Sequence, residues 1–141
     1  MTERFSVPIK VRHYELDTVG HLNHAVYHSY GEVARLELFE KAGALKGELE
    51  QERLFPVLLE SNIKFLRELR AGDSVLVTCE VKFGSRKVFE MNSNIVKLDG
   101  TVSAEITCTL GLMDMDLRKL VADPRGRLEK AGLDVGVFDA A

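Results

Sequence analysis

The sequence predicts an α+β domain in which an antiparallel β-sheet packs against a single long α-helix. Hydrophobic residues recur at helical spacing between Asn23 and Gly43, and from residue 55 onward they alternate with polar residues as in strands. Short turns separate the alternating runs, so neighbouring strands pair antiparallel and leave one apolar face for the helix to cover. We expect one domain over residues 1–141, with a core over about 5–115 and a C-terminal extension over 116–141.

The elements follow one another in a simple order. Residues 5–12 alternate weakly and predict a first strand, in which Pro8 favours an edge position. A helix of about 18–20 residues follows, with Asn23 as its N-cap and Gly43 as its stop signal. Its apolar stripe is Tyr27, Tyr30, Ala34 and Leu38. At 1.5 Å per residue this helix is about 27–30 Å long, and it should cross the whole core.

Four strands joined by short turns are expected after the helix. Alternation places them at residues 63–69, 75–83, 89–95 and 102–112. Asp99-Gly100 is a strong hairpin signal before the last of them. A short helix is expected over residues 124–132, and the tail beyond it is expected to fray.

Composition and charge argue against several classes of protein. The net charge of −3 does not favour binding to nucleic acid or to an anionic membrane. The start lacks the apolar core of a secretory signal, and no run of about 18 apolar residues predicts a membrane span. Cys79 and Cys108 lie in strand-like alternation, which favours buried free thiols over a disulfide. We therefore expect a cytoplasmic protein without nucleic-acid or membrane partners.

All the histidines of the chain lie in one short window around Asp17, at positions 13, 21, 24 and 28. A metal site, an acid–base or nucleophilic site and a chance clustering of surface residues all fit this pattern. His24 and His28 are one helical turn apart, and His21 with Asp17 could complete a metal site. The HExxH pattern is absent, however. We expect no metal.

A resemblance to a known family favours the second explanation. The stretch VRHYELDTVGHLNHAVYHSYGEVAR at 11–35 resembles the acyl-CoA thioesterases of the 4-hydroxybenzoyl-CoA thioesterase type. The shared signature is Asp17, then Gly20-His21-Leu22-Asn23, then Tyr27, then Glu32 with Arg35. SNIKFLRELRAGD at 61–73 is similar to the family's second strand and its Gly-Asp turn. The family carries asparagine or histidine at the position of His24, which leaves the acyl group open.

The resemblance implies a fold and an assembly. The fold is the hotdog fold, an antiparallel β-sheet wrapped around one long central α-helix. The assembly is a homodimer or homotetramer with sites at the subunit interface. One curved sheet around one helix also leaves a sheet edge and apolar surface to cover, which favours association.

Thioester hydrolysis needs a nucleophile or general base and a means to stabilise the oxyanion. The resemblance implies that Asp17 acts on the carbonyl, either as nucleophile through a mixed anhydride or as base for water. Free N–H groups at the helix start, near Asn23–Ala25, would polarise the carbonyl oxygen. His24 would hydrogen-bond the carbonyl or the leaving thiol. The expected pocket residues are Tyr27, His21, Gly20 and Ala25.

Each of these residues also has a structural explanation. A lone aspartate in a loop is usually a turn or cap residue, and His21 could mainly fix the loop. His13 and His28 are more typical of local packing. Glu32 and Arg35 could form an i,i+3 ion pair.

The leaving group suggests a second set of residues. Coenzyme A carries phosphates, which Arg and Lys bind well. Ser85, Arg86 and Lys87 fall at a predicted hairpin tip and are candidates, although a solvated turn explains them equally well. No cofactor is expected, because coenzyme A is part of the substrate. The sequence thus predicts a thioesterase acting on an acyl-CoA or acyl-carrier-protein thioester; the alternatives are a hotdog dehydratase or hydratase, and a non-catalytic acyl-thioester binding protein.

Overall fold

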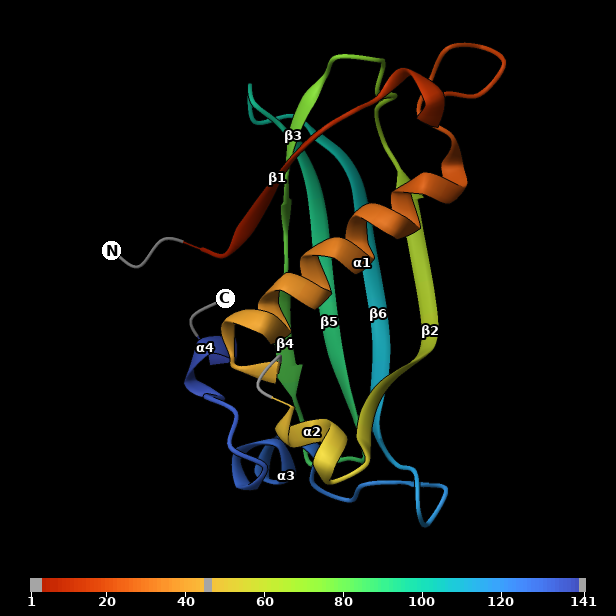
Figure 1. Cartoon of the computed structure of the whole chain (residues 1–141). Helices are drawn as coiled ribbons and strands as arrows, with labels where there is room; N and C mark the ends of the chain where they lie inside the picture. Colours follow the sequence, from red (N-terminus) through yellow and green to blue (C-terminus); the bar gives the residue numbers. More distant parts are fainter. Residues whose placement is uncertain (1–3, 45–46, 140–141) are drawn as a thin grey trace.

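The computed structural model describes residues 4–44 and 47–139. A curved antiparallel sheet carries the long helix α1, His24–Lys41, which crosses it diagonally (Figure 1). The predicted α+β arrangement, with a sheet around one long helix, is confirmed. Within the described ranges, no helix is both long and apolar enough to cross a membrane.

The edges of the sheet are β1 and β2. The strands are β1 (Ser6–Lys10), β2 (Leu54–Phe65), β3 (Ser74–Thr78), β4 (Glu80–Phe83), β5 (Val88–Lys97), β6 (Val102–Asp114) and β7 (Lys119–Leu120). Their order is β1-β3-β5-β6-β2, with β4 beside β5 and β7 beside β6. Pro8 therefore lies on an edge strand, as predicted, where its missing N–H is tolerated.

Helix α1 begins and ends where the sequence predicts. Asn23 caps it, because its Oδ1 accepts a hydrogen bond of 2.9 Å from the N–H of Ala25. The predicted stripe of Tyr27, Tyr30, Ala34 and Leu38 is buried. Gly31 lies on the same face, and a Cβ there would come within 3.1 Å of Ile106 Cδ1. The glycine therefore allows the helix to approach the sheet closely.

The predicted strand over residues 75–83 is interrupted at Cys79, which separates β3 from β4. Cys79 is fully buried, and burial raises the pKa of its thiol to about 12. Cys108 is also buried, and both thiols are free, as predicted.

Strand β2 contains a bulge that the sequence does not predict. Leu58 pairs with Leu110 on β6 and Glu60 pairs with Thr109, so Leu59 is an extra residue. Side chains alternate between the faces of a regular strand, so positions 58 and 61 would point to opposite faces. The bulge shifts this alternation, and the side chains of both residues face α1.

The C-terminal segment packs on the core through residue 139, and the expectation that it frays is wrong. It forms α3 (Pro124–Lys130), as predicted, and then α4 (Gly136–Asp139), while α2 (Glu48–Gln51) precedes β2. Phe138 is buried, with its ring edge-on to Phe39 at 5.4 Å between centroids. Arg125 donates two hydrogen bonds, of 2.6 and 2.7 Å, to the carboxylate of Asp139. The apolar tail residues had too little periodicity to predict this docking.

Candidate active site

The loop before α1 is closed by Asp17. The N–H of Asp17 donates to the carbonyl of His21 at 2.8 Å, and Asp17 Oδ1 accepts from the N–H groups of Val19 at 3.0 Å and His21 at 3.1 Å. Gly20 has a φ of +83°, which residues with a side chain rarely adopt. The turn role considered for Asp17 is therefore real.

The turn occupies only one oxygen of this carboxylate. No donor in the described part of the chain hydrogen-bonds Asp17 Oδ2. The side chain is exposed, so Oδ2 is accessible to a substrate. Asp17 can therefore hold the loop with Oδ1 and act chemically with Oδ2.

Three further bonds fix the entry of this loop into α1. The N–H of Leu22 donates to the carbonyl of Leu69 at 2.7 Å, and the N–H of Asn23 donates to the carbonyl of Glu15 at 3.0 Å. Glu15 Oε1 in turn accepts from the hydroxyl of Tyr30 at 2.7 Å. Burial, and then the hydrogen bond to Glu15, raises the pKa of Tyr30 above its ordinary value. Tyr30 therefore ties the loop to the second turn of the helix.

Fewer donors are free at the helix start than the sequence suggests. The N–H of Asn23 is bonded to Glu15, and that of Ala25 to the side chain of Asn23. The N–H of His24 has no partner among the residues that the structure describes. Because the first N–H groups of a helix carry the positive end of its dipole, His24 N–H is the available donor for a carbonyl oxygen.

A pocket of about 270 Å³ lies between this loop, the first turn of α1 and the segment that follows β2. Its lining is Asp17, His21, Leu22, His24, Tyr27, Phe65, Leu66, Arg67 and Glu68. The structure thus brings together four of the predicted residues: Asp17, His21, His24 and Tyr27. Gly20, Asn23 and Ala25 shape the loop and the helix start without lining the pocket.

Tyr27 forms the inner wall of this pocket. Its ring is almost fully buried and lies edge-on to Phe65, with 5.0 Å between the centroids. Burial raises the pKa of Tyr27, although the nearby Ser103 and the backbone of Leu69 act in the opposite direction. The hydroxyl is therefore neutral near physiological pH, as suits an orienting group.

Sequence reasoning did not select Arg67 and Glu68, which complete the lining. The backbone N–H of Glu68, and then the charge of His21, lowers the pKa of the Glu68 carboxyl. Arg70 and Lys97 act on it in the same direction, so cations surround this end of the sheet. Arg67 and Glu68 belong to the SNIKFLRELRAGD stretch, so this second motif was the signal that could have identified them.

The candidate phosphate-binding hairpin lies elsewhere. Ser85, Arg86 and Lys87 are exposed between β4 and β5, as predicted. Along β6, the hairpin lies at the level of Gly111, which pairs with Val88. The Asp17 pocket lies at the level of Ala104, which pairs with Phe65. Seven residues of strand at 3.3 Å per residue separate these levels, about 23 Å. Within one chain, the hairpin therefore does not join the Asp17 pocket.

The remaining candidates take structural positions. His13 packs edge-on against Tyr14, and His28 Nδ1 lies 3.3 Å from Ser61 Oγ. Glu32 and Arg35 do not form the ion pair considered above, and Arg35 Nη1 instead donates to Cys108 Sγ at 3.3 Å. In residues 4–44 and 47–139, no cluster of three or more His, Cys, Asp or Glu side chains is arranged to hold a metal ion.

Known proteins share this architecture. The YbaW probable thioesterase of Escherichia coli superposes with a TM-score of 0.80 at 24% identity, over 89% of this chain and 94% of that one. The protein SAV2348 of Staphylococcus aureus, solved in complex with CoA, gives 0.82 at 20% identity, over 99% and 87%. At these identities the likeness shows the fold, and the expected hotdog fold is confirmed.

Sequence similarity gives the family. The acyl-acyl carrier protein thioesterase ATL3 of Arabidopsis thaliana, described as chloroplastic, is 35% identical over 98 residues, which are 70% of this chain and 52% of that protein. The chain spans about half the length of the curated relatives that it matches. The model of the thioesterase-like superfamily matches residues 11–130. Because this match begins directly after β1, ends with α3 and so covers most of the chain, the chain belongs to the thioesterase-like superfamily.

Proposed function

We propose that the protein hydrolyses an acyl thioester of coenzyme A or of acyl carrier protein, with Asp17 as the reacting carboxylate. One observation carries the proposal. Asp17 and His24 line the same pocket, and each keeps one group, Oδ2 and the backbone N–H, without a partner in the described chain. These are the two groups that thioester hydrolysis requires.

The proposed reaction follows from this geometry. The thioester oxygen accepts a hydrogen bond from His24 N–H, which stabilises the negative charge as it develops. Asp17 Oδ2 either attacks the carbonyl carbon or takes a proton from the water that attacks it. In either route the C–S bond breaks, and the thiolate leaves and takes up a proton. In the first route water then cleaves the mixed anhydride, which frees the acid and restores the Asp17 carboxylate; in the second the oxygen of the attacking water ends in the carboxylic acid. The His24 imidazole lies beside this centre and would hydrogen-bond the carbonyl or the thiol.

The carrier of the acyl group is part of the proposal. One relative is named for acyl carrier protein, and one structural neighbour was solved with CoA. Both carriers present phosphate, and Arg67 in the pocket lining is the proposed cation that meets it. The resemblance to the 4-hydroxybenzoyl-CoA type supports the role of Asp17 more than it supports an aromatic acyl group.

A homo-oligomer is proposed on the basis of β2. This edge strand is 12 residues long. It exposes apolar side chains at Phe55, Leu58, Leu59 and Phe65. A long apolar edge invites pairing with another strand, and the β2 edge of a second copy is the proposed partner. Such pairing would also allow the distant hairpin of one subunit to approach the Asp17 pocket of the other.

The decisive experiment compares Asp17→Asn with wild type on a panel of acyl-CoA and acyl-carrier-protein substrates. Asparagine keeps an Oδ1 that can accept from Val19 and His21, so the loop should persist while the anionic oxygen is lost. We expect turnover to fall by at least about a thousandfold, with little change in thermal stability.

Asp99→Asn is the matched control. Asp99 also closes an exposed turn, by accepting from the N–H of Thr101 at 2.8 Å, and it lies outside the pocket. Activity of Asp17→Asn within about threefold of wild type would remove Asp17 from the reaction. Tight binding of acyl thioesters without thiol release by wild type would favour a binding protein instead.

A further inference from the structure

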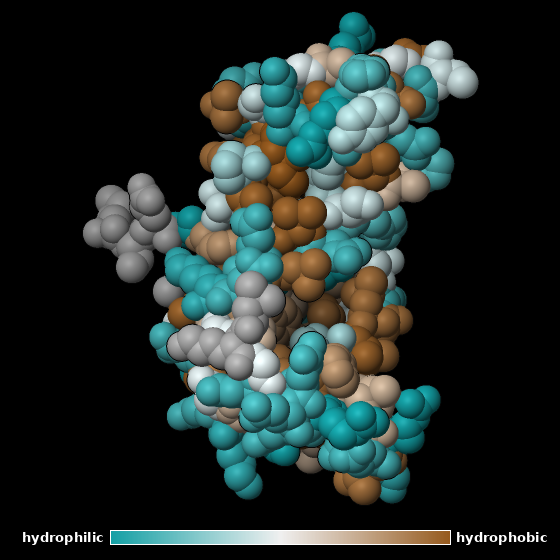
Figure 2. All heavy atoms as spheres, in the orientation of Figure 1, coloured by the Kyte–Doolittle hydropathy of each residue, from teal (hydrophilic) through white to brown (hydrophobic). Residues whose placement is uncertain are grey.

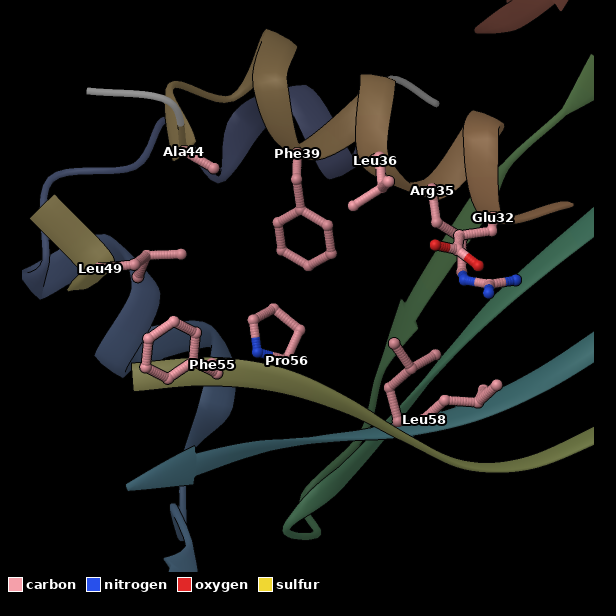
Figure 3. A pocket seen from close by; sticks show the side chains of 10 residues that line it. Glu32, Arg35, Leu36, Phe39, Ala44, Leu49, Phe55, Pro56 and Leu58 are labelled. Carbon is pink, nitrogen blue, oxygen red and sulfur yellow. The ribbon is translucent and has the colours of Figure 1, made fainter. Parts of the chain in front are cut away.

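A second pocket lies beneath the C-terminal half of α1. Its volume is about 480 Å³, larger than that of the Asp17 pocket. Figure 3 shows its walls, which are α1 above, β2 below and α2 at one end. The lining residues are Glu32, Arg35, Leu36, Phe39, Ala44, Leu49, Phe55, Pro56, Leu58 and Leu110. None of them was selected for binding from the sequence.

The polarity of this pocket changes along its length. Glu32 and Arg35 lie at the end nearer the middle of α1, and Ala44, Leu49 and Phe55 lie at the other (Figure 3). Among the residues that the structure describes, every side chain lining the far end is apolar. Figure 2 shows hydrophobic residues around a hollow on this face, between α1 and β2. A hydroxyl or charged group buried at the far end would lack a side-chain partner, which is costly.

The larger pocket lies further along α1 than the Asp17 pocket, where the proposed reaction takes place. The Asp17 pocket takes its helical wall from His24 and Tyr27, and this pocket begins at Glu32 on the same helix. The bulge in β2 turns Leu58 toward α1, so the strand contributes a wall to this pocket while Phe65 serves the other. Between the two, His28 touches Ser61 at 3.3 Å, so a ligand joining them would run along the exposed side of this contact.

We propose that this pocket holds the far half of a long, linear aliphatic acyl chain, an inference that rests on the proposed thioesterase function. A long aliphatic chain can reach this pocket and needs no polar partner at its apolar end, whereas a single aryl ring attached to the carbonyl is too short to reach it. The occupant is therefore the substrate's own tail. The function proposed above does not by itself specify this acyl class.

The spacing along α1 gives a length. Glu32 is eight residues from the His24 N–H donor, about 12 Å along the helix axis. An extended chain advances about 1.2 Å per bond, since three backbone bonds span about 3.6 Å. The pocket therefore begins about ten bonds from the carbonyl. Chains of about twelve carbons or more enter it, and the seven residues from Glu32 to Phe39 leave room for about eight carbons.

Leu36→Trp tests this by filling the pocket. Leu36 is 54% exposed, so the helix should tolerate a larger side chain there. Val33→Trp is the matched control, because Val33 is 38% exposed on the same helix and lies outside this pocket. The measurements are kcat/KM for butanoyl-, octanoyl-, dodecanoyl- and hexadecanoyl-CoA, the affinities of the non-hydrolysable thioethers butyl-CoA and hexadecyl-CoA, and the molar mass by light scattering.

We expect Leu36→Trp to reduce kcat/KM for hexadecanoyl-CoA by at least about tenfold and to leave butanoyl-CoA within about twofold. Val33→Trp should leave the profile unchanged. An equal effect of Leu36→Trp on short and long chains, or none, overturns the inference. A change in molar mass with an unchanged profile also overturns it, because a second copy would then be what covers the pocket.

The thioethers separate this inference from the proposed function. If wild type hydrolyses no acyl thioester, the proposed function fails. Tighter binding of hexadecyl-CoA than of butyl-CoA, abolished by Leu36→Trp, would still place the tail in this pocket. Equal binding of the two thioethers by wild type would reject the pocket, whatever the enzyme hydrolyses.

Discussion

The hydrogen bond between Tyr30 and Glu15 should be a main stabilising contact of the Asp17 loop. Tyr30→Phe removes this hydrogen bond and no other contact of the ring. The substitution deletes one hydroxyl and keeps the ring in the core. Tyr30 is 2% exposed and the Glu15 side chain 11%, so water cannot easily replace the lost 2.7 Å bond. Glu15 would keep its bond from the N–H of Arg12, at 2.8 Å, but lose its partner on α1.

The expected magnitude follows from the charge and the burial. A hydrogen bond to a charged group contributes about 1.5–3 kcal/mol. Unfolding entropy of about 2.1 cal/mol/K per residue gives about 0.3 kcal/mol/K for 141 residues. Tyr30→Phe should therefore lower the melting temperature by about 5–10 °C at neutral pH. Turnover should fall as well, because Glu15 also receives the N–H of Asn23 and so positions the helix start.

The pH dependence provides a second readout. The folded state raises the pKa of Tyr30, so the stability that this group contributes is complete below the unfolded tyrosine pKa of about 10. It is lost as the pH rises toward the folded pKa. The free energy of unfolding of wild type should therefore fall above about pH 10, and less steeply in Tyr30→Phe.

Urea unfolding followed by circular dichroism, at neutral and alkaline pH, makes these measurements. Tyr14→Phe is the control, because Tyr14 is 72% exposed and its hydroxyl donates no hydrogen bond in the described structure. Tyr30→Phe and Tyr14→Phe of equal stability at neutral pH would refute the reasoning. So would a parallel alkaline slope in wild type and Tyr30→Phe.

Three other predictions concern the site and the tail. His24→Ala should lower kcat by about tenfold to a hundredfold, whereas His28→Gln should have little effect, both with and without a chelator. A larger loss of kcat in His28→Gln than in His24→Ala, or loss of wild-type activity in the chelator, would favour a metal site. Arg67→Ala should raise KM for acyl-CoA more than it lowers kcat, and the effect should weaken in high salt; an unchanged KM at low salt would remove Arg67 from the binding site. Phe138→Ala should cost about 3–5 kcal/mol in urea unfolding, against little for the exposed Leu117→Ala; equal values would mean that the tail does not dock.

Local chemistry made the helix and its loop predictable. Asn23, the residues of the apolar stripe and Gly43 each act on neighbours within about one helical turn, so their effect can be deduced without the rest of the chain. The Asp17 signature is local for the same reason, and four of its residues do line one pocket. The fold class followed from the change of hydrophobic period after the helix.

Pairing between distant strands decided the rest. Leu59 is a bulge only because β6 supplies one residue fewer at that point, and neither strand shows this alone. The bulge in turn directs Leu58 into the larger pocket.

The sequence by itself determined the helix, the succession of helix and strands along the chain and the loop that carries Asp17, because each depends on neighbours in the chain. Tertiary structure alone decided which groups of that loop stay free. Asp17 Oδ1 and the N–H groups of Asn23 and Ala25 are occupied, whereas Asp17 Oδ2 and the N–H of His24 are not, in the chain as described. It also decided that the Ser85–Lys87 hairpin and the Asp17 pocket lie at opposite ends of the sheet. The physical reason is the same in both cases, because hydrogen bonding and strand register join residues that are far apart in sequence.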